Sequence, residues 1–480
     1  MPPIRILHLI TGLGLGGAET WLARLLSRLE GPQCGASTGP TPSVHSPTHC
    51  APDGSTPVGL APPARFECRV VSLLPLSGEH GALAGRIRDL GVPVESLNMG
   101  RGLGGILGLR GLAGTARLVL LLRQWRPQVV QTWLYHADLL GLLATRASGC
   151  GAAVSWGLRS GYMDFSRYGL GTRLTVRACA ALSPWPDAIT ANSRAGAQLH
   201  VSRLGYRPRR LAVLENGVDG GLFRPDAQAR AALRAQWGGH EGALLIGLAA
   251  RVDPMKGHDV FCAAISRVRQ RFPQVRPVFC GAGTGPGSAA FDALLKRHGL
   301  ADAALRLGQR DDMPQVLAAL DVLALPSLGE GFPNVVAEAL CCGTPVASLD
   351  VGEARAIIGP GGMLPVAGSG AAREAAEDRT EDGTQGAPDA LRGNLLAGEG
   401  PHDGMGGRMA EEAPGGAGGS AGLEARALAL ADCLTRLLEL EPAQRACLGA
   451  AGREHVLGRY GLDTAAERWA AHFESLAAGR

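Results

Sequence analysis

The sequence is nearly devoid of lysine: of its 47 basic residues only two, Lys256 and Lys296, are lysines. Because arginine is used everywhere else, a retained lysine indicates a place where a compact ammonium group is needed. No run approaches the roughly 18 apolar residues that a membrane-spanning helix requires. The N-terminus begins directly with an apolar strand pattern and lacks the regions of a signal peptide. We therefore expect a cytoplasmic protein, with peripheral contact to the inner membrane as an open alternative.

The 11 cysteines form no C-x-x-C pair and no cluster with histidine at metal-ligand spacing. They are scattered and odd in number, which suits small buried apolar residues in a reducing compartment better than a disulfide framework. We expect no metal site, no cofactor and no nucleic-acid partner.

Glycine and proline are abundant, with 70 and 31 residues, and they concentrate in two compositional breaks. Residues 31–64 mix Gly, Pro, Ser and Thr, and residues 368–423 mix Gly, Ala and Glu. Neither stretch has the apolar periodicity needed to bury enough surface to offset its ordering entropy. We predict two disordered insertions in surface loops, which a fold tolerates at little cost.

Charge is distributed unevenly along the chain. Residues 1–224 carry 23 basic against 12 acidic residues, whereas residues 225–480 carry 24 against 31. Much of the acidic excess falls in the second insertion, so the basic first half is the informative part. The positive electrostatic field of this half suits an anionic acceptor or an anionic membrane surface. The alternative is a solvated arginine-rich surface with no partner. The arginines that crowd its second portion are Arg159, Arg167, Arg173, Arg177, Arg203, Arg207, Arg209 and Arg210.

Strands and helices alternate along the first half, which predicts a parallel sheet covered by helices on both faces. A short apolar strand leads into a Gly-rich turn at residues 11–19 and then into a helix, so Gly16 and Gly17 lie where a ligand can approach the backbone. His136 follows another strand and is a candidate for a hydrogen bond to a ligand hydroxyl or for stabilising a reacting centre, with helix capping or packing as the alternative. The predicted strands are 4–10, 68–73, 92–97, 129–132, 154–158 and 188–191, and the predicted helices are 19–29, 80–90 and 112–125.

The helix at residues 112–125 has a broad apolar face together with arginines. Two interpretations are open for it: a crossover helix packed on the sheet, or a helix that lies on a membrane.

The second half restarts the same pattern with a buried strand at residues 244–249. Arg251 and Lys256 flank the loop that follows, where a guanidinium fork and an ammonium point charge can clamp a diphosphate. Solvated surface cations are the alternative. Further strands are predicted at residues 277–281 and 305–307, and Gly281 begins a tight loop that a nucleobase can approach.

Two carboxylates eight positions apart, Glu330 and Glu338, mark the most informative segment, residues 323–359. Residues 321–326 predict a buried strand, residues 327–332 a glycine-containing loop, and Pro333 the first residue of a helix. In an open α/β sheet, ligands bind in the crevice at the carboxyl ends of strands, and carboxylates bind vicinal hydroxyl groups well. Taken alone, the two glutamates fit solvent-exposed acids equally well.

The whole block, with Cys342-Gly343-Thr344-Pro345-Val346 after the glutamates, resembles the nucleotide-sugar motif of the retaining GT-B glycosyltransferases, in particular glycosyltransferase family 4. The resemblance implies that Glu338 binds ribose hydroxyls, while Glu330 and the following backbone amides hold the transferred sugar. The spacing of Arg251, Lys256 and Gly257 is similar to the family's Arg-x4-Lys-Gly motif. Residues 16–19, 131–141 and 215–219 resemble further family segments, although many members have His where this chain has Gln131 and Trp133.

The resemblance implies the α/β GT-B fold, with two doubly wound Rossmann-like domains facing across a cleft. We expect an N-terminal acceptor domain at 1–217, a nucleotide-sugar domain at 218–458 and a final helix at 459–480 that crosses back. The implied activity is retaining, metal-independent transfer of a sugar from a UDP- or GDP-type donor to a glycan, lipid-linked or other hydroxyl acceptor, in polysaccharide or glycolipid synthesis. An epimerase of the same fold and a non-catalytic sugar-nucleotide-binding protein are the alternatives. The predicted catalytic residues are Arg251, Lys256, Glu330 and His136, and the predicted substrate-binding residues are Gly16, Gly17, Arg159, Asn216, Gly281, Gly331, Phe332, Pro333, Asn334 and Glu338.

Overall fold

The computed structural model describes residues 2–30, 65–100, 108–237, 242–365 and 420–479. They fall into two compact units: unit 1 comprises residues 1–155 and 469–480, and unit 2 comprises residues 156–468. The two predicted insertions lie outside the described residues, except that positions 420–423 belong to a helix. The predicted domain boundary at residue 217 and the predicted final helix segment at 459–480 stay predictions.

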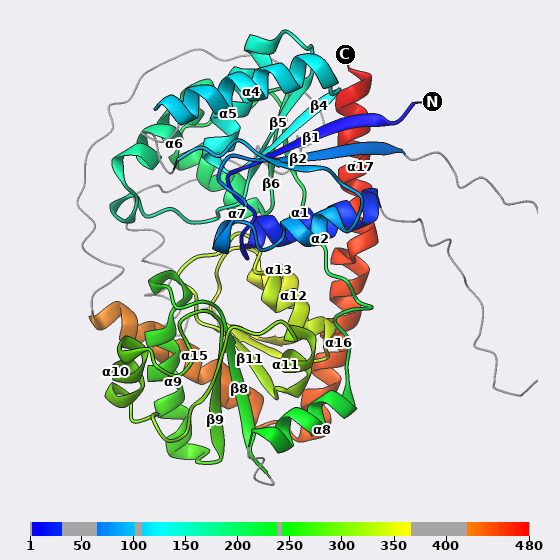
Figure 1. Ribbon diagram of the computed structural model, residues 1–480. Helices are drawn as coiled ribbons and strands as arrows, with labels where there is room; N and C mark the ends of the chain where they lie inside the picture. Colours follow the sequence, from blue (N-terminus) through cyan, green and yellow to red (C-terminus); the bar gives the residue numbers. More distant parts are fainter. Residues whose placement is uncertain (1, 31–64, 101–107, 238–241, 366–419, 480) are drawn as a thin grey trace, which may run out of the picture. The chain divides into compact units, whose positions relative to one another are not determined.

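Unit 1 alternates strands with helices, as the sequence predicts (Figure 1). Its elements are β1 (Ile4–Ile10), α1 (Gly17–Leu29), β2 (Phe66–Ser72), the 3₁₀ turn η1 (Gly78–His80), α2 (Ala84–Arg88), β3 (Val94–Ser96), α4 (Leu109–Trp125), β4 (Val129–Trp133), α5 (Tyr135–Ser148), the first half of β5 (Ala153–Leu158) and the second half of α17 (Leu462–Ala478).

Unit 2 continues with the rest of β5 and repeats the alternation. Its further elements are η2 (Phe165–Arg167), α6 (Leu170–Leu182), β6 (Ala188–Ala191), α7 (Arg194–Gln198), η3 (Leu199–Arg203), β7 (Leu211–Val213), α8 (Ala227–Gln236), β8 (Leu244–Ala249), η4 (Pro254–Lys256), α9 (His258–Arg271), β9 (Val275–Cys280), α10 (Ala289–Arg297), β10 (Leu305–Gly308), α11 (Met313–Ala319), β11 (Val322–Leu325), α12 (Asn334–Cys341), β12 (Val346–Ser348), α13 (Ala354–Ile358), β13 (Gly362–Met363), α15 (Ser420–Leu438), α16 (Pro442–Tyr460) and the start of α17.

The strands form two sheets with the same internal order. One sheet runs β3-β2-β1-β4-β5-β6-β7, and the other runs β10-β9-β8-β11-β12-β13. The pairs around the first strand of each sheet are parallel: β1 pairs with β2 and β4, and β8 pairs with β9 and β11. This is the doubly wound Rossmann order, in which the chain reverses direction across the sheet beside the first strand. The predicted α/β class with two Rossmann-like sheets is confirmed, and ligand crevices are expected beside β1/β4 and β8/β11.

Alternate residues of the strands in unit 2 enter two different cores. Ile246 and Leu248 of β8 pack with α9 and α15, whereas Leu245 packs with α11, α12 and α16. Figure 1 shows these helices distributed around β8 and β11. Because both faces of the sheet are covered, its strands read as continuous apolar runs in the sequence.

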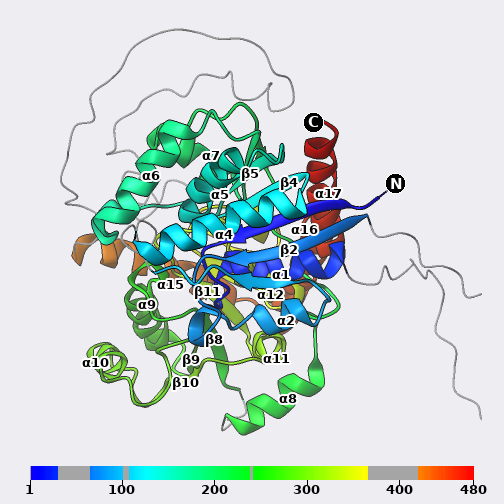
Figure 2. The same cartoon turned by 45° about the horizontal axis from the view of Figure 1, so that its top comes forward.

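In unit 1, α4 and α5 cover one face of the strands. Leu118 and Leu122 of α4 lie in a core with Leu7 and Leu9 of β1 and Val130 of β4, and Figure 2 shows α4 over these strands. The crossover-helix interpretation of residues 112–125 is therefore confirmed for the inner face of α4.

The end of α17 contributes aromatic rings to unit 1. Trp469 stacks on Trp133 with ring centroids 5.2 Å apart, and Phe473 meets His8 edge-on at 5.8 Å. His472 lies 3.0 Å from the Ser155 hydroxyl. These contacts tie the last helix to β1, β4 and β5 within the unit.

One predicted helix is wrong in part. The sequence predicts a helix at residues 80–90, but the structure has the turn η1 and only five helical residues in α2. Glycine explains the interruption, because a side chain at Gly81 would overlap the carbonyl oxygen of Leu76 and the flexible Gly85 and Gly91 weaken a helix.

Nine cysteines lie in the described residues, and none of these forms a disulfide. Seven are buried, and burial raises the pKa of the Cys262 and Cys433 thiols to about 12. They are small apolar side chains in the core, as predicted. Among the helices of the described residues, none is long and apolar enough to cross a bilayer.

Candidate functional site

A pocket of about 440 Å³ opens in unit 2 at the carboxyl ends of β8 and β11, the neighbouring strands at the switch point of the second sheet. This volume lies within the range of ligand-binding pockets, roughly 300–1,000 Å³. Four cations and three carboxylates line it, so the pocket is polar and carries a small excess of positive charge. Its lining residues are Arg159, Ser160, Gly161, Tyr162, Asp164, Arg167, Tyr168, Arg251, Asp253, Met255, Lys256, Gly329, Glu330 and Gly331.

The loop after β8 is shaped by its own hydrogen bonds. Asp253 caps the short helix η4, accepting a hydrogen bond from the Met255 N–H at 2.8 Å. Gly257 then turns the chain into α9 with φ of +66°, and a side chain there would overlap the carbonyl oxygen of Pro326. This loop places Arg251 and Lys256 in the lining of the same pocket, which an anion clamp requires.

Lys256 and Glu330 meet in this pocket. The Lys256 Nζ atom donates a hydrogen bond to Oε1 of Glu330 at 2.7 Å, and the Ser327 hydroxyl donates to the same oxygen at 2.7 Å. Both charged side chains are partly buried. The ion pair joins the end of β8 to the end of β11, so the two predicted motifs form one constellation.

Asp253 has a second role, because its carboxylate is shared by two guanidinium groups. Arg251 lies 3.2 Å from one oxygen and Arg167 lies 3.4 Å from the other. Burial opposes ionisation of this carboxyl, but the hydrogen bond from Met255 and the two arginines outweigh it and lower its pKa. An ionised Asp253 therefore orients two of the four cations of the pocket.

Backbone packing places the loop that carries Glu330. A side chain at Gly161 would overlap the carbonyl oxygen of Glu330, and so would one at Gly352, where φ is +55°. The Glu353 N–H donates to the Gly331 carbonyl at 3.1 Å. The loop is thus held between two glycine-containing segments that leave no room for a Cβ atom.

A chain of polar side chains runs from the pocket to the start of α12. Arg159 donates to the Asn216 Oδ1 at 3.1 Å, and the Asn216 Nδ2 donates to the Asn334 Oδ1 at 2.8 Å. All three are sequence-predicted site residues, and the structure connects them although they lie in three different segments.

Other predicted residues of the same segment lie away from the pocket lining. Phe332 is buried, and its ring packs edge-on against Tyr460 with centroids 5.4 Å apart. Pro333 is the N-cap of α12, so the helix begins at Asn334, one residue after the predicted start. Glu338 is half-buried on the second turn of α12 and does not line the pocket.

Gly281 has a packing reason to be glycine. Its φ is +141°, and a Cβ atom would overlap the carbonyl oxygen of Ala250 at the end of β8. The residue lets the ends of β8 and β9 approach each other closely, and it does not line the pocket.

Unit 1 contains the remaining predicted residues, which lie at the switch point of its own sheet. Gly16 is the N-cap of α1 and Gly17 is the first residue of that helix, directly after β1. His136 lies in the first turn of α5, directly after β4. Both turns therefore end neighbouring strands of the first sheet.

His136 is half-buried, and burial lowers the pKa of its imidazole. Its Nε2 atom is buried and makes no hydrogen bond within the described residues. The preceding residue Leu134 has φ of +75° and ψ of 151°, a conformation found almost only for glycine. The imidazole thus has a buried ring nitrogen with no hydrogen-bond partner among the described residues, next to a strained backbone.

The neighbours of His136 have structural roles instead. Asp138 is fully buried and accepts a hydrogen bond from the Thr132 hydroxyl at 2.5 Å. Gln131 and Trp133, where many family members have His, are also fully buried, and the Trp133 Nε1 lies 3.4 Å from the His8 Nδ1.

Several residues of the pocket lining were not predicted from the sequence. Tyr162, Asp164 and Tyr168 line the pocket, and they lie in the segment directly after β5. The signal available in the sequence was their position after a strand, but nothing in the segment has a diagnostic spacing. Within the described ranges, no three His, Cys, Asp or Glu side chains are grouped so as to hold a metal ion.

Two family models match the chain. A model described as "Glycosyltransferase Family 4" matches residues 73–220, and one described as "Glycosyl transferases group 1" matches residues 243–379. Curated relatives include D-inositol 3-phosphate glycosyltransferases from Salinispora arenicola, 34% identical over 35% of this chain, and from Xylanimonas cellulosilytica, 36% identical over 36% of this chain. The matches span 40% and 42% of those relatives' lengths.

Solved structures resemble the whole chain. Anabaena HepE, in complex with UDP and glucose, has a TM-score of 0.68 at 18% identity, covering 98% of this chain and 100% of that one. Sucrose-phosphate synthase from Thermosynechococcus elongatus has a TM-score of 0.65 at 15% identity, covering 99% and 100%. These similarities show a shared fold.

Proposed function

We propose that this chain, which belongs to the family 4, group 1 glycosyltransferases of the GT-B fold, transfers a sugar from a UDP- or GDP-type donor to a hydroxyl group of an acceptor, with retention at the anomeric carbon. The observation that carries the proposal is the pocket at the β8/β11 switch point. There Arg251, Lys256 and Glu330 line one cavity, two of them joined by a 2.7 Å ion pair.

The proposed reaction exchanges one bond for another at the anomeric carbon. The bond from that carbon to the donor phosphate oxygen breaks, and its electron pair leaves with the nucleoside diphosphate. A bond to the acceptor oxygen forms on the same face, and the hydroxyl proton passes to the departing phosphate. No protein nucleophile is assigned.

Charge that develops on the leaving diphosphate is the main quantity for the protein to stabilise. Arg251 and Lys256 are already oriented, by Asp253 and Glu330 respectively. Preorganised cations in a partly buried pocket stabilise such charge more than water does, because they need no reorganisation during the reaction. On this proposal these two residues supply the electrostatic stabilisation without a bound metal ion.

Glu330 is assigned to the transferred sugar. Its Oε1 atom accepts from Lys256 and Ser327, and we assign the other oxygen, Oε2, to a sugar hydroxyl. Glu338 keeps its assignment to the ribose, and Asn334 and Asn216 to the donor side of the pocket. In unit 1, His136 and the Gly16-Gly17 turn are assigned to substrate on the strength of their place at the first sheet's switch point.

The test begins with thermal shift of the full chain against UDP, GDP, ADP and CDP, followed by sugar release from the matching donors. UDP is the first nucleotide to try, since it is named for the Anabaena structure. D-inositol 3-phosphate, named for the relatives, belongs in the acceptor panel. Donor-dependent glycoside formation supports the proposal. Nucleotide binding without turnover indicates the non-catalytic alternative, and conversion of the donor to its epimer indicates the epimerase.

A further inference from the structure

Helix α4 has two apolar faces, and the residues that the structure describes cover only one. Its inner face, with Gly114, Leu118 and Leu122, is buried against the sheet. On the opposite face, Leu109 is 88% exposed and Leu120 is 53% exposed, and both lie in one stripe with Ala113 and Ala116 at i, i+4, i+7 and i+11. Leu112, 59% exposed, widens the stripe.

The segment that contains α4 carries only positive charge in its sequence. From Ser96 to Ala137 the sequence contains five arginines and no acidic residue. Arg110 and Arg117, spaced i, i+7, run along one flank of the leucine stripe. The facing edge strand β3 contributes one carboxylate, Glu95, which lies 2.9 Å from Arg117.

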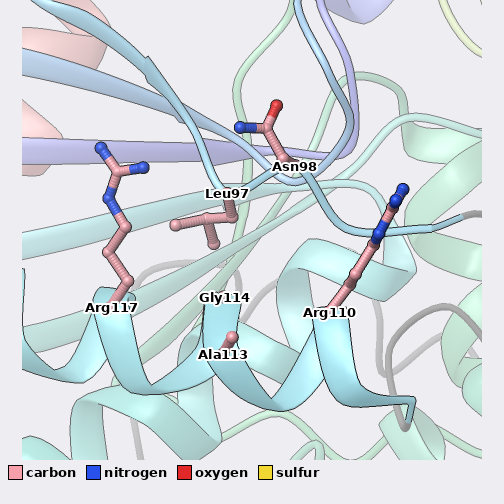
Figure 3. A pocket seen from close by; sticks show the side chains of 6 residues that line it. All are labelled: Leu97, Asn98, Arg110, Ala113, Gly114 and Arg117. Atoms are coloured by element: carbon pink, nitrogen blue, oxygen red, sulfur yellow. The ribbon is translucent and has the colours of Figure 1, made fainter.

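These two arginines also line a cavity of about 320 Å³ between α4 and the residues after β3. Figure 3 shows Arg110 and Arg117 projecting from α4 on either side of Leu97, with Asn98 above them. Arg117 is steadied by a hydrogen bond to the Ser96 carbonyl at 3.2 Å. Asn98 adopts φ of +50°, and its backbone N–H donates to the Ser96 hydroxyl at 2.9 Å. The cavity is thus bordered by two guanidinium groups and an amide, which are groups that bind phosphate.

We propose that the outer face of α4 docks on an anionic lipid bilayer, with Leu109, Leu112 and Leu120 entering the interface and Arg110 and Arg117 binding a headgroup phosphate. Apolar and basic side chains on one exposed helix face are the features of a helix that lies in a membrane interface. A nucleic acid offers phosphates but nothing that would cover three leucines. The site lies outside the donor pocket and does not depend on the proposed transfer reaction.

The test is co-sedimentation of the full chain with vesicles of phosphatidylcholine, alone or mixed with phosphatidylglycerol. The wild-type protein is expected to bind the mixed vesicles and to lose that binding as salt is raised. Leu109→Glu/Leu120→Glu should weaken binding by at least about tenfold, because two buried leucines are lost. Leu222→Glu and Leu428→Glu, at leucines 52% and 47% exposed elsewhere, are the matched controls and should bind like wild type.

A second pair of variants tests the phosphate contact. Arg110→Gln/Arg117→Gln should weaken binding by roughly 25-fold, from about fivefold per removed charge. Arg110→Lys/Arg117→Lys keeps the charge and should retain most of the binding. The circular dichroism spectrum and the melting temperature should match those of the wild type in all these variants, which confirms that they are folded.

Several results overturn the proposal. The proposal is wrong if the protein binds neutral and mixed vesicles equally. It is also wrong if the control variants lose as much vesicle binding as the α4 variants. Binding of single-stranded RNA that the arginine variants abolish and the leucine variants leave intact assigns the surface to nucleic acid instead. A dimer in light scattering that Leu109→Glu/Leu120→Glu converts to monomer assigns it to a second copy of this chain. If inorganic phosphate fully displaces the wild-type protein from the vesicles, the surface is a site for free phosphate rather than a membrane contact.

Discussion

The ammonium nitrogen of Lys256 lies 2.7 Å from Oε1 of Glu330, although 74 positions separate the two residues in the sequence. One residue ends the loop after β8, and the other lies in the loop after β11. Each sits where its charge is partly shielded from water, so removing either leaves the other in a costly environment. A double-mutant cycle on Lys256 and Glu330 should therefore be non-additive.

Lys256→Ala and Arg251→Ala should each lower turnover more than they lower nucleoside diphosphate binding, because both cations meet charge that grows in the transition state. The expected loss is about 2–4 kcal/mol, or roughly 30- to 1,000-fold in rate. The other lysine offers a matched control, since Lys296 is exposed on α10. Initial rates and calorimetric titration check this. Unchanged rates in both variants, or an equal loss in Lys296→Ala, would remove the clamp.

Glu338→Ala and Glu330→Ala should fail in different ways. Loss of the ribose contact at Glu338 should weaken diphosphate binding by about 1.5–3 kcal/mol, the usual worth of a hydrogen bond to a charged group. Glu330→Ala should leave the affinity for the free nucleoside diphosphate nearly unchanged. The rate of sugar transfer from the nucleotide-sugar donor should fall sharply. Titration calorimetry beside initial rates separates the two. If both variants bind and transfer like wild type, the glutamates are ordinary surface acids.

Gly161→Ala should reduce activity far more than it reduces stability. The added methyl group overlaps the Glu330 carbonyl oxygen and must move the loop. A misplacement of about 1 Å in a reacting constellation can cost about 100-fold in rate. Gly169→Ala is the control, because a Cβ atom at that position meets nothing within 4 Å. Equal rates in the two variants would show that the Glu330 loop need not be held so closely.

Buried histidines should make stability fall on mild acidification. Burial lowers the pKa of His8 to about 3 and, against the hydrogen bond to Gly196, that of His200 to about 4. As pH falls below about 6.5, these histidines take up protons in the unfolded chain but stay neutral in the folded chain. The free energy of unfolding therefore decreases, down to about pH 4 for His200 and about pH 3 for His8. Each histidine contributes at most about 1.4 kcal/mol per pH unit.

Urea titrations at pH 7 and pH 5 measure that slope. His200→Gln removes one titrating group and keeps a donor for the Gly196 carbonyl, which lies 2.7 Å from the imidazole Nδ1. The variant should therefore show a shallower dependence on pH than the parent. An identical slope would mean that His200 titrates alike in both states.

Strand positions were predictable because buried parallel strands are continuous apolar runs. The predicted bounds 4–10, 188–191 and 244–249 agree with β1, β6 and β8 residue for residue. The order of strands within each sheet was not predictable in the same way, since pairing joins segments far apart in the chain. The switch points beside β1 and β8 appear only once that order is known.

Side-chain direction is what the sequence could not supply at the site. The motif around Glu330 does not say which of its side chains reach the pocket: the Phe332 ring packs against Tyr460 in the core, and Glu338 is not among the residues that line the cavity. Conversely, Arg167 reaches Asp253 across 86 positions. Such a contact depends on how two loops pack, and no local spacing encodes it.

The backbone conformation of Leu134 lowers the stability of unit 1 while it fixes the geometry of the turn before α5. A leucine held at φ of +75° costs on the order of 1–3 kcal/mol that glycine would not. Leu134→Gly would relieve this backbone strain, against the loss of the half-buried leucine side chain. The same change would loosen the turn before His136, so on the proposed assignment of His136 to substrate the more stable variant would be expected to bind substrate less well.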